Sequence, residues 1–259
     1  MEILQSILMG IVQGFTEFLP VSSTAHLILV PWFLGWGGAI NSMSFDIALH
    51  IGTLLSLLVF FFRDWVELFL RKQKLLMLLA IATIPAAVAG KLLDKFVEAN
   101  LRSPWIIAAA LVVIGIVMYI ADKRGSKLTG MDNLAVSDAV IIGISQAIAI
   151  IPGVSRSGIT ISSGLFLGMK REAAARFSFL MSTPIVGGAA LLHGVQMLHG
   201  KSEAVNPMIF IAGVAASFVA GLIAISWLLK FLSKYSLTFF VYYRFALAVI
   251  IVAGIWLKP

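Results

Sequence analysis

The sequence predicts an all-α polytopic membrane protein with six transmembrane helices and two re-entrant helical hairpins in an inverted-topology repeat. Hydrophobic residues make up 60% of the 259 residues, well above the roughly 45–50% of a soluble domain, and the mean hydropathy is +1.02. Apolar runs such as 47–62 and 108–121 carry almost no charge. Two clusters of polar residues interrupt the apolar pattern, and these clusters resemble each other.

The apolar segments fall into two groups. Spanning the hydrocarbon core takes about 20 helical residues, but the pairs 3–18/21–34 and 137–151/154–168 are mostly shorter and are interrupted by proline and hydroxyl residues. We therefore expect each pair to form a re-entrant hairpin. The remaining apolar segments are predicted to be the six spans. They cover residues 45–62, 75–93, 104–121, 176–199, 208–229 and 238–257.

Charge indicates how the chain lies in the membrane. The net charge of +7 comes from cations in short loops, which membrane topology and anionic lipid headgroups explain better than nucleic acid does. With the N-terminus and loop 35–44 outside, the main basic clusters fall inside. This rule supports the orientation but not the depth of the hairpins. The inner clusters are Arg63/Arg71/Lys72/Lys74, Lys123/Arg124/Lys127, Lys170/Arg171/Arg176 and Lys230/Lys234; Lys91, Lys95, Arg102, Lys201 and Lys258 remain outside.

An internal repeat runs through the chain. Shifted by 133 residues (Gly10 onto Gly143), the two polar clusters align without gaps, and three predicted spans follow each hairpin. Halves with an odd number of crossings must be inverted in the membrane. We predict one integral membrane domain, 1–259, with repeats of about 1–121 and 137–259; chance similarity among small apolar residues is the alternative. The identical pairs are Gly10/Gly143, Ile11/Ile144, Gln13/Gln146, Val21/Val154 and Ser22/Ser155.

The two clusters carry charged and nucleophilic side chains, which are unfavourable in lipid and therefore usually functional. Pro20 and Pro152 are each expected to end one half-helix and open another. The hydroxyls of Ser22-Ser23-Thr24 and the segment Ser155-Arg156-Ser157 then lie in first helical turns. Helix N-termini have free N–H groups and partial positive charge, and they bind phosphate. If the hairpins meet, Arg156 supplies a cation to the same cavity.

Spacing suggests roles for two further residues. His26 lies three residues after Ser23, so on a helix it shares a face with that hydroxyl. A hydroxyl beside an imidazole suits nucleophilic attack with general-base assistance. Glu17 lies four residues after Gln13, and the two side-chain oxygens on one helical face suit a divalent cation, Mg²⁺ or Ca²⁺.

Some of these residues have simpler explanations. Membrane helices often use serine for packing or for bonds to their own carbonyls, which is the better interpretation of Ser22, Ser23 or Ser157 taken alone. Asp46 and His50 share a face of the next span and either line the cavity or serve helix pairing. Arg244 follows two tyrosines and is interpreted as an interfacial anchor.

The two motifs resemble those of a known family, the bacitracin-resistance type of undecaprenyl-diphosphate phosphatase. The resemblance covers essentially the whole chain. It rests on Gln13-x-x-x-Glu17, Phe18-Leu19-Pro20-Val21-Ser22-Ser23-Thr24-x-His26 and Pro152-Gly153-Val154-Ser155-Arg156-Ser157-Gly158-x-Thr160. It implies a multi-pass enzyme of the bacterial inner membrane, with its active site open to the outside. This enzyme hydrolyses a polyprenyl diphosphate to the monophosphate and so recycles the lipid carrier for envelope synthesis.

The resemblance also implies roles for individual residues. Ser23 matches the proposed nucleophile, His26 its partner, Glu17 the metal-associated carboxylate and Arg156 the phosphate-binding arginine. Gln13 stands where many members have glutamate, which removes one charge from the expected metal site. The remaining substrate-binding hydroxyls are expected at Ser22, Thr24, Ser155, Ser157 and Thr160.

Two other classes of protein are compatible with some of these features. A carrier that flips a phosphorylated lipid also uses inverted repeats and broken helices, but it has no need of Ser23 beside His26. A polyprenol kinase is disfavoured because the chain lacks a phosphate-binding Gly-x-x-x-x-Gly-Lys loop. The absence of cysteine excludes disulfides and thiolate chemistry, and the start of the chain lacks the basic region of a signal peptide. The expected partners are the polyprenyl diphosphate and membrane lipids, not nucleic acid; a homodimer is left open.

Overall fold

The computed structural model describes residues 1–199 and 207–257, without the side chains of 94, 98 and 192–199. Lys201 and Lys258, expected outside the membrane, therefore lie beyond the described residues. Within these ranges the regular elements are helices, as predicted. They are α1 (Glu2–Phe18), α2 (Ser23–Leu34), η1 (Gly38–Asn41), α3 (Met43–Phe60), α4 (Phe62–Leu70), α5 (Gln73–Asn100), α6 (Pro104–Arg124), η2 (Met131–Asn133), α7 (Val136–Ile148), α8 (Arg156–Phe166), α9 (Arg171–His199), α10 (Pro207–Leu232) and α11 (Thr238–Leu257).

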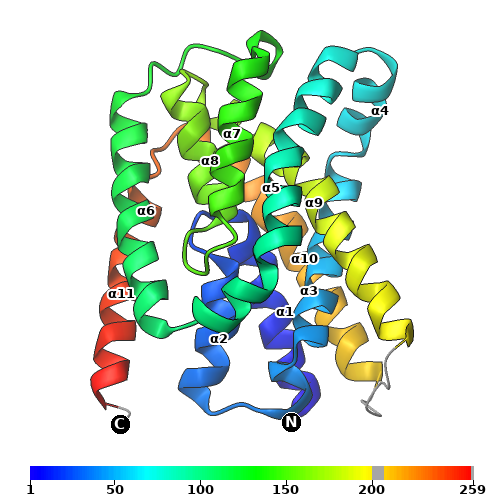
Figure 1. The fold of residues 1–259 in the computed structure, drawn as a ribbon, viewed down its shortest axis with the longest axis vertical. Helices are drawn as coiled ribbons and strands as arrows, with labels where there is room; N and C mark the ends of the chain where they lie inside the picture. The colour runs from blue at the N-terminus through cyan, green and yellow to red at the C-terminus, as the bar shows by residue number, and fades with distance from the viewer. Residues whose placement is uncertain (200–206, 258–259) are drawn as a thin grey trace.

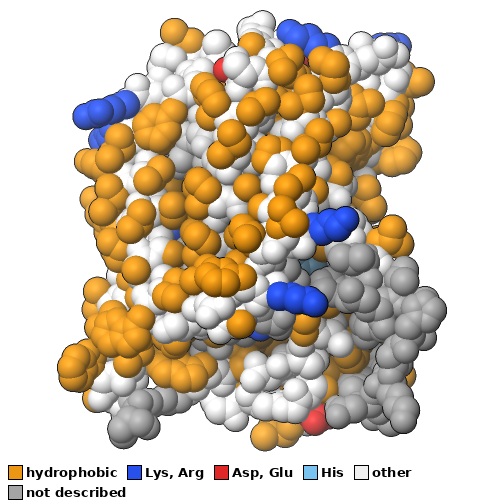
Figure 2. Space-filling model, viewed as in Figure 1, with side chains coloured by type: hydrophobic (Ala, Val, Ile, Leu, Met, Phe, Trp, Pro, Cys, Tyr) orange, Lys and Arg blue, Asp and Glu red, His pale blue; other side chains and the backbone are white. Residues whose placement is uncertain are grey.

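Six helices in the described part of the chain are long and apolar enough to cross a membrane, which confirms the six predicted spans. They are α3, α5, α6, α9, α10 and α11. Hydrophobic side chains cover most of the face shown in Figure 2, while several Lys and Arg side chains gather at its upper edge. Such a surface suits contact with lipid around the helices and with headgroups at the edge.

One helix was not expected from the sequence. α4 forms where the sequence suggested a loop with the basic residue Arg63. Its charged residues alternate with large apolar ones, so Leu68 is buried while Phe69 stays exposed. Glu67 pairs with Lys72 at 3.3 Å across the end of this helix. An amphipathic helix of this kind suits a position at the membrane interface.

Each segment expected to form a hairpin is a pair of short helices, and the two pairs approach each other from opposite ends of the molecule (Figure 1). Figure 1 shows α1–α2 entering from the end where both termini lie and α7–α8 entering from the other end, with their turns meeting near the middle. Both turns use the same unusual backbone: Ser22 has φ +76° and Ser155 has φ +70°. These residues align in the repeat, so the shared conformation supports the inverted-repeat interpretation.

Each hairpin packs on the opposite half of the chain. α1 lies along α10, where Gly10 and Gly14 let the backbones approach closely; a Cβ added to Gly14 would lie 2.8 Å from the nitrogen of Gly221. The aligned Gly143 of α7 likewise meets the backbone of Ala82 in α5. Small residues at such crossings are typical of membrane helices. Because the halves interlock in this way, they form one packed body that brings the two turns together.

Candidate active site

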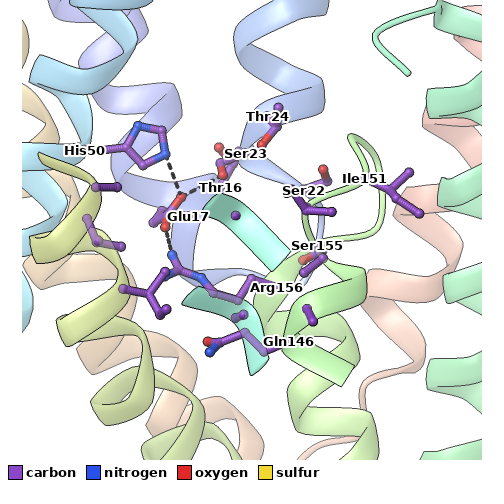
Figure 3. A pocket seen from close by; sticks show the side chains of 18 of the residues that line it. Thr16, Glu17, Ser22, Ser23, Thr24, His50, Gln146, Ile151, Ser155 and Arg156 are labelled. Carbon is purple, nitrogen blue, oxygen red and sulfur yellow. Dashed lines mark hydrogen bonds and ion pairs between the residues drawn. The ribbon is translucent and has the colours of Figure 1, made fainter. Parts of the chain in front are cut away.

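The turns of the two hairpins border a cavity of about 320 Å³ (Figure 3). As predicted, the first turns of α2 and α8 both line this cavity. One part of its wall is polar and comes mainly from α1, α2, α3 and α8; the rest is apolar and comes mainly from α5, α7 and α9. The polar residues include Thr16, Glu17, Ser22, Ser23, Thr24, His50, Ser155 and Arg156, and the apolar ones include Ile47, Ala86, Ile150, Ile151, Val186 and Ala190.

Glu17 is the centre of the polar part. Its side chain is 3% exposed, and its Oε2 accepts a hydrogen bond from the Ser23 hydroxyl at 2.6 Å. Gln13 Nε2 donates to the same oxygen at 3.1 Å, and His50 Nε2 lies 3.6 Å away. A carboxylate that accepts several hydrogen bonds in a buried site is held in one orientation.

Arg156 joins the two hairpins through this carboxylate. Its Nη2 forms an ion pair with Glu17 Oε1, although 139 residues separate the two in the chain. Its Nη1 donates to the carbonyl of Ser182 on α9 at 3.4 Å. Arg156 and the Ser23 hydroxyl therefore bind the two different oxygens of one carboxylate, and both residues line the cavity.

His26 does not contact Ser23, contrary to what their spacing suggested. Its Nδ1 lies 2.7 Å from the carbonyl of Ser22, and its Nε2 lies 2.7 Å from the hydroxyl of Tyr243. Because a carbonyl only accepts, Nδ1 carries a proton and Nε2 faces Tyr243. The side chain points back along α2 onto α11, so the group beside the Ser23 hydroxyl is Glu17, not the imidazole. A catalytic role for His26 stays a prediction.

Among the described side chains, His50 is the histidine that lines the cavity. Its Nδ1 lies 2.7 Å from the carbonyl of Asp46, one turn earlier in α3, which leaves Nε2 directed toward Glu17 (Figure 3). From the sequence, His50 was expected either to line the cavity or to serve helix pairing. What shows that His50 lines the cavity is its position opposite Glu17. That position depends on how α3 packs against α1, which the periodicity of either segment does not reveal.

Like His26, three further residues predicted for the site do not line the cavity. Ser157 donates to the carbonyl of Leu19 at 3.2 Å and so connects the two turns. Thr160 bonds to Ser178 on α9 at 2.7 Å. Gln13 is fully buried behind Glu17 and has no contact with the cavity. Gln13 and Thr160 share a helical face with the cavity residues Glu17 and Arg156, but each lies one turn farther along its helix and is covered by its neighbours.

Arg244 is buried, contrary to the prediction that it lies at the membrane interface. The predicted interfacial anchor is 0% exposed, and its guanidinium donates to carbonyls from both hairpin turns, including Pro20 at 3.2 Å and Gly153 at 2.7 Å. It also bonds to Leu111 of α6 at 3.1 Å. Its neighbour Tyr243 contacts His26. α11 thus fixes the relative position of the two turns that form the cavity.

The residues present fit a divalent cation only in part. Among the described residues, no group of three or more His, Asp or Glu side chains is arranged to hold a metal. The Gln13 amide presents nitrogen, not oxygen, to Glu17, and its own oxygen is buried without a partner. Glu17 alone fits the way Mg²⁺ binds through one carboxylate, waters and substrate phosphates.

Comparison with known proteins identifies the class to which this fold and site belong. The family described as "Bacitracin resistance protein BacA" matches residues 6–250. The chain therefore belongs to this family of multi-pass membrane proteins, as the sequence motifs indicated.

Curated relatives align over nearly their full lengths. A protein of Thermodesulfovibrio yellowstonii is 51% identical over 251 residues, with 96% of each chain covered. Proteins of Moorella thermoacetica and Pelotomaculum thermopropionicum are 48% and 46% identical, over 100% and 98% of each chain. All three carry the name undecaprenyl-diphosphatase.

Proposed function

We propose that this protein hydrolyses undecaprenyl diphosphate to undecaprenyl phosphate and inorganic phosphate. The observation that carries the proposal is the arrangement around Glu17, where the Ser23 hydroxyl is bonded to one carboxylate oxygen and Arg156 to the other. A nucleophile, a base and an anion-binding cation thus lie at one point of a membrane cavity. A lipid carrier has no use for a serine hydroxyl activated in this way. The product monophosphate is the lipid carrier that envelope synthesis consumes.

The cavity matches the two-part character of the substrate. The diphosphate fits the polar part, where Arg156 and the N-termini of α2 and α8 attract negative charge. The prenyl chain fits the apolar wall of α5, α7 and α9, with residues such as Ile150 and Val186. This orientation brings the terminal phosphate next to Ser23.

The reaction proceeds in two steps. Glu17 accepts the proton of Ser23 as Oγ attacks the terminal phosphorus and the bond to the bridging oxygen breaks, releasing the lipid monophosphate. Water then attacks the phosphoserine; its proton goes to the departing phosphate, and Glu17 returns a proton to Ser23 Oγ. Arg156 leaves Glu17 for the phosphate and stabilises the charge that develops during the transfer. Direct attack of an activated water on the terminal phosphorus is the alternative route, in which no phosphoserine forms.

A divalent cation, Mg²⁺ or Ca²⁺, is proposed to accompany the diphosphate. Glu17 would hold it together with phosphate oxygens and waters, as Mg²⁺ commonly binds nucleotide phosphates. The ion would neutralise phosphate charge. The contacts of Gln13 give no support for a direct metal bond from that residue.

The site is proposed to face the outside of the bacterial inner membrane. The basic clusters indicate that the end of the molecule carrying both termini is outside, and α1–α2 enters from that end (Figure 1). The homodimer considered from the sequence is a separate question, which the mass of the detergent-solubilised protein answers.

Phosphate release tests the proposal. Purified protein in detergent is given a polyprenyl diphosphate with Mg²⁺, with Ca²⁺ or with EDTA. We expect metal-dependent release that is lost in Arg156→Ala, with exposed Arg63→Ala as the matched control. Folded wild-type protein that releases no phosphate under any condition would instead favour the lipid carrier, which transport in liposomes would then test.

A further inference from the structure

Gln146 lies in the cavity wall and has no assigned role. It is 3% exposed, yet neither Nε2 nor Oε1 has a hydrogen-bond partner in the part of the chain that the structure describes. It lines the same cavity as Arg156, and Figure 3 shows Arg156 between Glu17 and Gln146. A buried amide without partners destabilises a protein, so such groups usually serve a ligand or a reaction.

The repeat shows what kind of partner is missing. Gln146 aligns with Gln13 of the first half, whose amide donates to the carboxylate four residues later, Glu17. The residue four positions after Gln146 is Ile150, so the second half has the donor without the anion. A bound anion would give the Gln146 amide the partner that Gln13 finds in its own helix.

The position of Gln146 along the cavity indicates which phosphate of the diphosphate it would bind. Ser23 and Glu17 fix the place of the terminal phosphate, and the prenyl chain requires apolar walls. Gln146 is the polar cavity residue of α7, and the cavity residues that follow it, Ala147 of α7 and Ala149, Ile150 and Ile151 of the turn, are apolar, as are Ala86 and Gly90 of the neighbouring α5. With Arg156 on one side of it (Figure 3) and this apolar wall on the other, Gln146 borders both parts of the cavity. The phosphate attached to the lipid must occupy this boundary.

We propose that Gln146 binds the lipid-side phosphate of the prenyl diphosphate, with its Nε2 donating to a phosphate oxygen beside Arg156. This proposal rests on the proposed diphosphatase function. It makes Gln146 a specificity residue, because a ligand without a phosphate at that position leaves the amide unpaired. The reaction product keeps the lipid-side phosphate and retains this contact, whereas inorganic phosphate comes from the terminal position and lacks it.

Two inhibitors separate the two phosphate positions. The full-length protein in detergent is assayed with farnesyl diphosphate, with farnesyl monophosphate and inorganic phosphate as competitors. Gln146→Leu loses a hydrogen bond to a charged group. We therefore expect the KM for farnesyl diphosphate and the inhibition constant of farnesyl monophosphate to rise by about tenfold or more. The inhibition constant of inorganic phosphate should change by less than about twofold. Ser145→Ala is the matched control, because Ser145 bonds to its own helix at the carbonyl of Ile142.

The outcomes distinguish the inference from the function on which it rests. Equal changes in both inhibition constants, or no change in either, would overturn the role of Gln146. If Gln146→Leu does not fold, Gln146→Glu keeps the shape and should weaken farnesyl monophosphate binding further, because its carboxylate repels phosphate. Wild-type protein without turnover would refute the diphosphatase function. Thermal stabilisation of wild type and Gln146→Leu by the same two ligands would still decide the role of Gln146.

Discussion

Replacing Glu17 with glutamine perturbs the centre of the site while preserving its shape. The amide still accepts a hydrogen bond from Ser23, but it is a poor proton acceptor and no longer carries the charge that pairs with Arg156. Loss of a general base lowers kcat by about 10²–10⁴-fold. At saturating divalent cation KM should not rise, because Arg156 no longer has to leave a carboxylate before it binds phosphate.

The same substitution should lower stability. Removing one partner of a buried ion pair destabilises a protein by about 3–5 kcal/mol; the Arg156 side chain is 18% exposed, so we expect less than this range. The assays are steady-state phosphate release and thermal unfolding in detergent. Glu67→Gln is the control, since Glu67 is a half-exposed carboxylate on α4 that pairs with Lys72. A kcat within a few-fold of wild type would refute the role of Glu17 as the base.

Three further predictions concern residues around the cavity. Arg244→Lys should lower both the melting temperature and kcat, because a lysine amine has too few donors to replace a guanidinium that bonds to carbonyls of both turns; a melting temperature equal to that of wild type would contradict this. Gly14→Ala should destabilise the protein in a thermal unfolding assay, since the added methyl meets Ala220 and Gly221, whereas Gly188→Ala, with nothing within 4 Å, should not; equal effects would contradict the α1–α10 packing. His26→Gln should retain more phosphate release than Glu17→Gln, because His26 contacts Tyr243 instead of Ser23; the reverse order would restore the imidazole as the base.

Much of the fold could be predicted from the sequence, because the thickness of the bilayer sets the length of the helices that cross it. Spans such as α6 and α11 follow directly from apolar runs between charged loops. Pro20 and Pro152 located the two turns, since proline disfavours continuing helix. α4 was missed because its apolar residues are interspersed with charges, and a short amphipathic pattern resembles a loop.

The candidate site was predicted only in part. Glu17, Ser23 and Arg156 stood out as polar residues in apolar surroundings, and the structure brings them together. Their partners depend on helix packing that local spacing does not encode. Arg244 lies near the start of α11, which suggested a position at the membrane interface. In the structure the turns of both hairpins extend to this level and bury it, so closeness to the helix end did not indicate exposure.

The measurement that tests the central claim most directly is a rapid-quench experiment with a polyprenyl diphosphate labelled in its terminal phosphate. Wild-type protein should carry the label on Ser23 before it appears as free phosphate. Ser23→Ala should carry no label and release no phosphate, although it still binds the substrate. Release by purified Ser23→Ala at the wild-type rate would contradict attack by the serine and leave water as the nucleophile.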